Sequence, residues 1–214
     1  ISDYAKDSIM EALRRDPNKS TTVAHPGGDH IPIHTKKPKS STTTSYLRLG
    51  TIEARKAPLE ILEEFERAIT GNPDLDIELH FVGKPASVDI YLNDAIERAL
   101  ARDLPIRWTQ GATDTQVMQI IQESDVFLSY GTEGYGIPVL ESIRMGTPVV
   151  FDGIQPAAEI MEAHGAHRLP LDQVFTQPME QLVSDSDQAR VPGWIGYVGQ
   201  VTDQLKINSS HQSP

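Results

Sequence analysis

Hydrophobic residues in the central part of the chain follow two alternating patterns. Short apolar runs predict six strands, over residues 46–50, 76–83, 105–111, 125–131, 147–152 and 167–171. Between them, apolar residues recur every three or four positions, which predicts helices over 57–70, 87–101, 114–124, 137–146 and 155–165. Strands that alternate with helices are joined by right-handed crossovers and form a parallel sheet covered on both faces. The pattern therefore predicts an α/β fold with a doubly wound, Rossmann-like, six-stranded parallel sheet.

The first two of these helices have clear apolar faces. These faces consist of Leu59, Leu62, Phe65 and Ile69 in one helix, and of Val88, Leu92, Ile96 and Ala99 in the next. Pro58 in the first turn and Gly71 at the C-cap are typical end signals for the first helix. Asp114 is predicted to cap the helix that begins there.

The two ends of the chain lack this alternation. Residues 2–15 predict a helix with Ser2 as its N-cap, and residues 34–45 are polar with three lysines, which indicates a linker. Apolar residues at helical spacing from Trp194 to Leu205 predict a closing helix. We therefore divide the chain into an interdomain segment and linker (1–45), one domain (46–207) and a tail (208–214).

The expected strand order singles out one pair of loops. Doubly wound sheets commonly have the order 3-2-1-4-5-6, with a ligand crevice at the carboxyl ends of the first and fourth strands. The loop after the first strand is GTIEARK (50–56), and the loop after the fourth is YGTEGYG (130–136). Arg55 and Lys56 are therefore expected to lie beside the segment EGYGIPVLE (133–141).

Residue types in these two loops suit a phosphate group. Gly134 and Gly136 would let a ligand approach the backbone, and a helix starting near Ile137 would direct its positive end at the crevice. Arg55 and Lys56 add two cations, which together with the helix would bind a phosphate or diphosphate.

Two carboxylates in the second loop suit polyols. Glu141, predicted in the first turn of the helix, could accept hydrogen bonds from a vicinal diol such as a ribose, and Glu133 could accept them from a second sugar. Diphosphate, ribose and another polyol together describe a nucleotide sugar. The first-strand loop has no G-x-G-x-x-G pattern, which argues against a dinucleotide such as NAD.

Composition excludes several other classes. The net charge of −11 makes the surface as a whole unsuitable for nucleic acid or anionic lipid. There is no cysteine, so disulfides and thiolate metal sites are impossible, which fits a cytoplasmic location. No apolar run is long enough for a membrane span. Since the chain begins at Ile1, we expect it to be processed or to be a piece of a longer protein.

Histidines do not suggest a metal site. Pro32 between His30 and His34 argues against a helix that presents both, and a glycine separates His164 from His167. We therefore expect binding without a metal or cofactor.

The ordered motifs GTIEARKAPLEILEEFERA, ELHFVG, DVFLSYGTEGYGIPVLESIRMGTPVVFDG and AAEIME resemble the C-terminal, donor-binding half of a retaining family 4 glycosyltransferase with the two-domain GT-B fold. The resemblance covers about residues 46–163. Residues 1–45 resemble the segment that precedes this half, so the chain is expected to lack the N-terminal domain that carries the acceptor site. The enzyme would act in the cytoplasm, or peripherally at the cytoplasmic membrane face through that domain.

This resemblance implies roles for individual residues. Glu133 and Glu141 match the family's E-x7-E signature, in which the second glutamate holds the ribose and the first holds the donor sugar. Arg55 and Lys56 match the basic pair that neutralises the diphosphate leaving group. The remaining residues expected to contact the donor are Gly50, Thr51, Gly111, Gly134, Tyr135, Gly136 and Ile137, with Gly111 lying in the stretch that lines the base (110–114).

The first-strand loop also departs from the family pattern. Thr51 stands where many relatives have arginine, Ala54 where proline is frequent, and Ala57 where glycine or asparagine is frequent. The loop resembles GTIEPRKN of mannosyltransferases, which favours GDP-mannose over a UDP-sugar as the donor. The expected function is glycosyl transfer with retention to a glycan or lipid-linked acceptor. A GT-B epimerase of UDP-sugars and a non-catalytic nucleotide-sugar-binding module are the alternatives.

Overall fold

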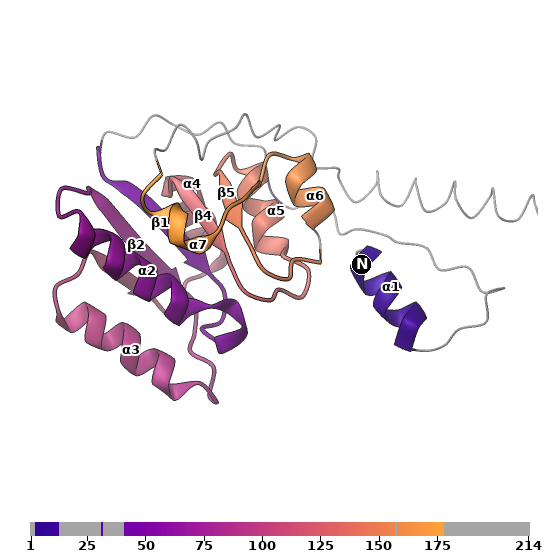
Figure 1. The fold of residues 1–214 in the computed structure, drawn as a ribbon, viewed down its shortest axis with the longest axis horizontal. Coiled ribbons are helices and arrows are strands. Elements are labelled where there is room, and N and C mark those ends of the chain that lie inside the picture. The colour runs from indigo at the N-terminus through magenta and orange to yellow at the C-terminus, as the bar shows by residue number, and fades with distance from the viewer. Residues whose placement is uncertain (1–2, 13–30, 32–40, 157, 178–214) are drawn as a thin grey trace, which may run out of the picture.

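Six strands form one parallel sheet in the computed structural model, which describes residues 3–12, 31, 41–156 and 158–177. Figure 1 shows the sheet with its helices. The strands are β1 (Thr44–Leu49), β2 (Ile77–Val82), β3 (Ile106–Thr109), β4 (Val126–Ser129), β5 (Val149–Phe151) and β6 (His167–Arg168). Their order is β3-β2-β1-β4-β5-β6, and every neighbouring pair is parallel. The predicted doubly wound sheet and its strand order are therefore confirmed.

Helices precede, connect and follow the strands, and the connecting helices follow the predicted alternation. They are α1 (Asp3–Ala12), the 3-10 helix η1 (Ala54–Lys56), α2 (Pro58–Gly71), α3 (Ile90–Ala101), α4 (Asp114–Glu123), α5 (Ile137–Arg144), α6 (Ala158–Ala163) and α7 (Leu171–Val174). The short helices η1 and α7 were not predicted, because three or four residues are too few to show a helical period. The predicted helix near Trp194 and the tail lie outside the described residues.

Each face of the sheet has its own hydrophobic core. One core joins the sheet to α2, α3 and the segment around α7, and the other joins it to α4, α5 and α6, in agreement with Figure 1. In the first core, the ring of Phe175 packs edge-on against Tyr46 and Phe65, with centroid separations of 4.9 and 5.3 Å. Burying one such side chain contributes roughly 1.5–3 kcal/mol. The two cores hold the loops at the carboxyl edge of the sheet in place.

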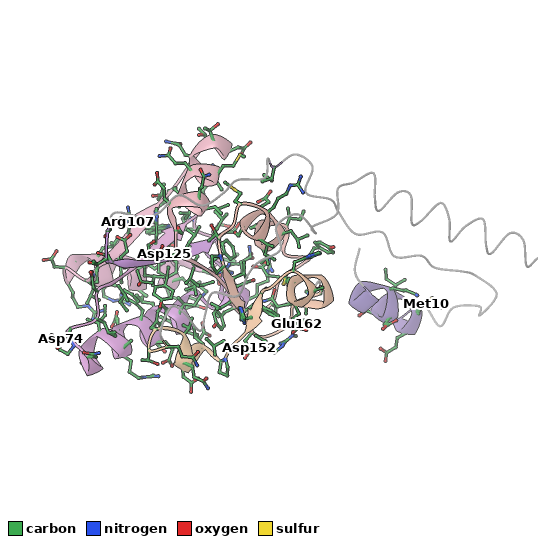
Figure 2. The ribbon with its side chains drawn as sticks, turned by 90° about the horizontal axis from the view of Figure 1, so that it is seen from above. Met10, Asp74, Arg107, Asp125, Asp152 and Glu162 are labelled. Carbon is green, nitrogen blue, oxygen red and sulfur yellow. The ribbon has the colours of Figure 1, made fainter. Side chains whose placement is uncertain are left out.

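Side-chain bonds also fix the strands to one another. At the start of the sheet, Asp125 Oδ2 accepts hydrogen bonds from the amide and the hydroxyl of Ser45, both at 2.8 Å, which ties β4 to β1. At the β6 edge of the sheet, the guanidinium of Arg168 pairs with the carboxylates of Asp152 at 3.3 Å and Glu162 at 3.2 Å. Figure 2 labels both of these acidic residues.

Several predicted element ends differ in the structure. Helix α3 begins at Ile90, so Val88 lies before it and is 83% exposed, whereas Leu92, Ile96 and Ala99 are buried as predicted. The reason is that the preceding loop pairs with the first-strand loop, where the side chain of Asp89 accepts a hydrogen bond from the amide of Ala54 at 3.0 Å.

The predicted caps are displaced by one residue. Thr113, not Asp114, caps α4 through a reciprocal capping box with Gln116. Helix α2 includes Gly71, and Asn72 is its C-cap. Strand β1 begins at Thr44, inside the predicted linker, and Ser2 lies outside the described residues.

His80 makes the stability of the sheet dependent on pH. It is buried in β2, and its Nε2 atom lies 2.8 Å from the Thr109 hydroxyl. Burial, with a smaller contribution from the Arg107 cation, lowers the pKa of His80 from 6.5 to about 4. Between these values the unfolded chain binds a proton that the folded chain excludes, so stability falls as pH falls through this window.

We expect His80 to account for about 2 kcal/mol of the stability lost between pH 7.5 and pH 5. Urea unfolding at both pH values measures this loss. Between pH 7.5 and pH 5, the His80→Gln variant should lose about 2 kcal/mol less free energy of unfolding than the unaltered chain does. The other titratable groups are shared by the two proteins, so an identical pH dependence in both would exclude His80 as the cause.

Candidate functional site

Loops at the carboxyl edge of the sheet are in direct backbone contact. A Cβ atom at Gly83 would lie 1.9 Å from the carbonyl oxygen of Gly50, and one at Gly131 would lie 2.2 Å from that of Arg55. Both glycines also have positive φ angles, so a larger residue would be strained as well as crowded. The loop after β1 is therefore held between the loops after β2 and β4.

Hydrogen bonds fix the same contact between the first and fourth loops. The amide of Thr132 donates to the Arg55 carbonyl at 2.5 Å, and Arg55 Nη1 donates to the Thr132 carbonyl at 2.6 Å. The predicted adjacency of the loops 50–56 and 130–136 is therefore confirmed.

Five charged residues meet where these loops touch, and we call them the charge cluster: Arg48, Glu53, Arg55, Lys56 and Glu133. Glu133 Oε1 lies 3.1 Å from Arg48 Nη2, and its Oε2 lies 3.9 Å from both Arg55 Nη1 and Lys56 Nζ. Glu53 Oε1 lies 2.6 Å from Arg55 Nη2 and 3.4 Å from Lys56 Nζ. Three cations against two carboxylates leave one positive charge, which is suited to an anion.

Members of the charge cluster differ in access to solvent. The side chain of Arg55 is 46% exposed, whereas that of Glu133 is 12% exposed and that of Arg48 is 3% exposed. An incoming anion would therefore meet Arg55 first, with Lys56 and Glu133 below it.

Arg48 is a member that sequence reasoning missed. It lies within the run YLRLG, which was interpreted only as an apolar strand. Burial lowers the pKa of the Arg48 guanidinium, and the neighbouring Glu133 carboxylate opposes this shift. The signal that could have found it is a charged residue inside a strand expected to be covered on both faces, because buried charges need partners.

The two glycines of the fourth loop have different surroundings. Gly134 is exposed, and a Cβ atom there would have no neighbour within 4 Å, which leaves room for a ligand. A Cβ atom at Gly136 would lie 2.4 Å from Met161 Cε, so the missing side chain there serves the packing of α5 against α6. Gly136 also caps α5 with a left-handed backbone.

Helix α5 carries Glu141 in its second turn, not in its first. The helix begins at Ile137, and Pro138 has no N–H group, so the second residue of the helix offers no amide donor to the crevice. Tyr135 is partly buried against Leu140, and Ile137 is exposed. A contact of Glu141 with a ribose remains a prediction.

The other predicted contacts are available to solvent. Thr51 is exposed beside the partly buried Gly50, and Gly111 is exposed two residues after the end of β3. These three residues, like Glu53, Arg55, Lys56 and Glu133 of the charge cluster, follow the carboxyl ends of strands, where ligands of such sheets bind.

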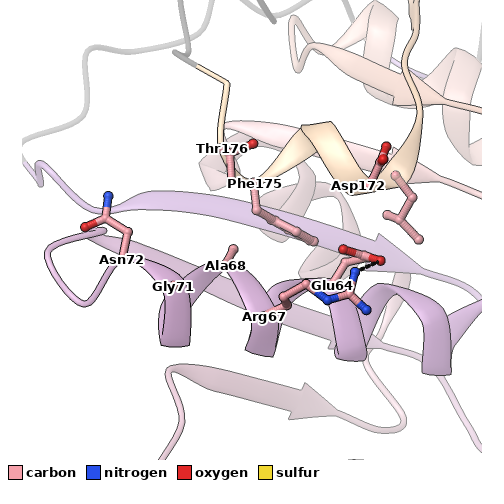
Figure 3. Close-up of a pocket in the computed structure, with 9 residues that line it drawn as sticks. Glu64, Arg67, Ala68, Gly71, Asn72, Asp172, Phe175 and Thr176 are labelled. Atoms are coloured by element: carbon pink, nitrogen blue, oxygen red, sulfur yellow. Dashed lines mark hydrogen bonds and ion pairs between the residues drawn. The ribbon is translucent and has the colours of Figure 1, made fainter.

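A separate pocket of about 290 Å³ lies between α2 and α7 with the residues that follow α7 (Figure 3). Ala68, Leu171 and Phe175 form its apolar lining, and Glu64, Arg67 and Asp172 surround it with charge. Glu64 pairs with Arg67, one turn away on α2. This pocket includes none of the predicted site residues.

The described residues contain neither a metal-binding cluster nor a membrane-spanning helix. No group of three or more histidine or acidic residues there could hold a metal ion. None of the helices in this part of the chain is long and apolar enough to cross a membrane.

Comparison with known families decides the classification. The model of the family described as glycosyl transferases group 1 matches residues 44–185. The chain belongs to the group 1 glycosyltransferases. Among curated members of similar sequence, the serotype-specific mannosyltransferase WbdA of Escherichia coli is 27% identical over 122 residues, which are 56% of this chain and 15% of WbdA. The chain therefore matches a small part of this curated relative.

Solved glycosyltransferase structures have the same fold. WaaG, a glycosyltransferase involved in lipopolysaccharide biosynthesis, has a TM-score of 0.64 and 16% identity, covering 95% of this chain and 57% of WaaG. Anabaena Alr3699/HepE in complex with UDP-glucose has a TM-score of 0.60 and 14% identity, covering 77% of this chain and 49% of that one. This group 1 glycosyltransferase chain is thus one Rossmann-like half of a GT-B fold and spans about half the length of these structures.

Proposed function

We propose that this chain binds the nucleoside-diphosphate sugar of a glycosyltransferase that transfers the sugar with retention to a glycan or lipid-linked acceptor. The observation that carries the proposal is the charge cluster. It brings Arg55 and Lys56 within 3.9 Å of Glu133, at the junction of β1 and β4. We favour GDP-mannose as the donor, because WbdA is a mannosyltransferase and the loop GTIEARK resembles that of mannosyltransferases. A UDP-sugar is the alternative, supported by the UDP-glucose complex of HepE.

The proposed mechanism uses the positive charge of the cluster. As the bond between the anomeric carbon and the diphosphate breaks, negative charge develops on the leaving oxygens. Arg55 and Lys56 would stabilise this charge by direct hydrogen bonds, without a metal ion. Glu133 would accept a hydrogen bond from a sugar hydroxyl, and Gly134 would leave room for the sugar. The reaction would take place in the cytoplasm.

Glu141→Ala tests the orientation of the donor. If Glu141 binds the ribose, this change should weaken GDP or UDP binding by about 10- to 150-fold, since a hydrogen bond to a charged group contributes about 1.5–3 kcal/mol. Inorganic pyrophosphate, which has no ribose, should bind almost unchanged. Calorimetry of both ligands checks the expectation, and an equal loss for both would remove Glu141 from the ribose.

Product analysis distinguishes the alternative activities. A transferase forms the glycosylated product only when an acceptor is present, whereas an epimerase converts UDP-sugar without one. A binding module would bind the donor and form neither product even when the chain is combined with an acceptor-binding domain.

A further inference from the structure

Arg48 is a buried cation for which the proposed donor offers no partner. Its guanidinium donates to the carbonyl oxygens of Leu49 at 3.0 Å and Lys56 at 3.3 Å, and to Glu133 Oε1 at 3.1 Å. These bonds offset the cost of removing the charge from water. Since Arg48 is almost inaccessible, a diphosphate in the crevice would not reach it.

Glu133 lies between Arg48 and the two accessible cations. The separation of 3.1 Å from Arg48 is a hydrogen bond, whereas the separations of 3.9 Å from Arg55 and Lys56 are longer than one. The negative charge of Glu133 is therefore compensated mainly by Arg48, which is the more deeply buried of the two residues.

Glu53 already uses part of the positive charge of Arg55 and Lys56. It lies 2.6 Å from Arg55 and 3.4 Å from Lys56, so the three groups together carry one net positive charge. A second carboxylate paired directly with these cations would cancel that charge. The affinity of the site for anions thus depends on keeping Glu133 paired with Arg48.

We propose that Arg48 is a positioning residue that holds and compensates Glu133, so that Arg55 and Lys56 remain available to a diphosphate. The inference rests on the diphosphate site of the proposed function and adds the residue that regulates its charge. Without Arg48, the poorly solvated Glu133 carboxylate has Arg55 and Lys56 as its next cations. A movement of about 1 Å would bring it into direct hydrogen bonds with them, because such bonds are about 2.7–2.9 Å long.

The test is a double-mutant cycle on the full 214-residue chain, with inorganic pyrophosphate as the calorimetric probe at low salt. Arg48→Met should weaken pyrophosphate binding by about tenfold in the presence of Glu133, and by less than about threefold in the Glu133→Gln background. Arg107→Met is the matched control. Arg107 is an exposed cation on the edge strand β3, paired with Glu78, and its removal changes the net charge equally.

Each outcome decides the proposal. An unchanged affinity in Arg48→Met, or an equal loss in both backgrounds, would overturn it, because a merely structural role would not depend on Glu133. If Arg48→Met does not fold, Arg48→Gln removes the charge and keeps a donor for the two carbonyls, and the same cycle applies.

The proposed function can fail separately. Suppose that the pyrophosphate affinities of the four proteins in the cycle are as expected, but that neither UDP nor GDP binds. The nucleotide-sugar function is then contradicted, and the role of Arg48 stands. If the unaltered chain does not bind pyrophosphate, the proposal for Arg48 is contradicted.

Discussion

The 214-residue chain is expected to bind a nucleoside-diphosphate sugar and yet to transfer its sugar extremely slowly. The chain covers 57% of WaaG and 49% of HepE, and the predicted donor contacts all follow strands at the carboxyl edge of one sheet, in loops, in η1 and in the first two turns of α5. Transfer requires that an acceptor be aligned with the donor and that water be excluded. Alignment alone can contribute about 7–11 kcal/mol, or roughly 10⁵- to 10⁸-fold in rate.

Labelled GDP-mannose and UDP-sugars, incubated with the chain and a membrane extract as the acceptor source, test this expectation. Full-length Escherichia coli WbdA serves as the active reference, and calorimetry on the same sample shows whether the donor is bound. Transfer within about tenfold of the reference would show that the chain contains all that the reaction needs.

Lys56→Met is expected to weaken GDP or UDP binding by about 10- to 150-fold, or about 1.5–3 kcal/mol. Lys56 Nζ lies between Glu53 and Glu133, at 3.4 and 3.9 Å, and methionine retains most of its apolar stem while removing the charge. Binding should also weaken with rising salt in the unaltered chain, and less steeply in the variant.

Arg107→Met again controls for the loss of one charge. Calorimetry at two salt concentrations measures both effects. A Lys56→Met variant that binds nucleotide as tightly as Arg107→Met does would exclude Lys56 from the diphosphate site.

Sequence periodicity predicted the sheet well because buried strands and helix faces leave a strong apolar pattern. Phe65 and Ile96, for example, lie in the core as expected. The end of a helix depends on interactions with distant loops. Val88 fits the helical spacing of α3. However, the hydrogen bond from the amide of Ala54 to the side chain of Asp89 holds residues 88 and 89 in the loop before the helix. No local sequence pattern reveals this long-range bond.

The candidate site was predictable where topology alone brings residues together. The strand-order rule placed Lys56 near Glu133, and their charged groups are 3.9 Å apart. Arg48 was missed because its function depends on a partner 85 residues away in the sequence. The close packing at Gly136 was missed for the same reason, since Met161 comes from a later helix.

The most direct test of the central claim, that the charge cluster is the nucleotide-diphosphate site, is a nuclear magnetic resonance titration of the isotope-labelled chain with GDP and UDP. The account predicts that the largest amide shifts occur in residues 50–56 and 130–136, at the carboxyl ends of β1 and β4. Amides lining the pocket between α2 and α7, such as those of Arg67 and Phe175, should change little. The largest shifts in that pocket, with none around Lys56 and Glu133, would contradict it.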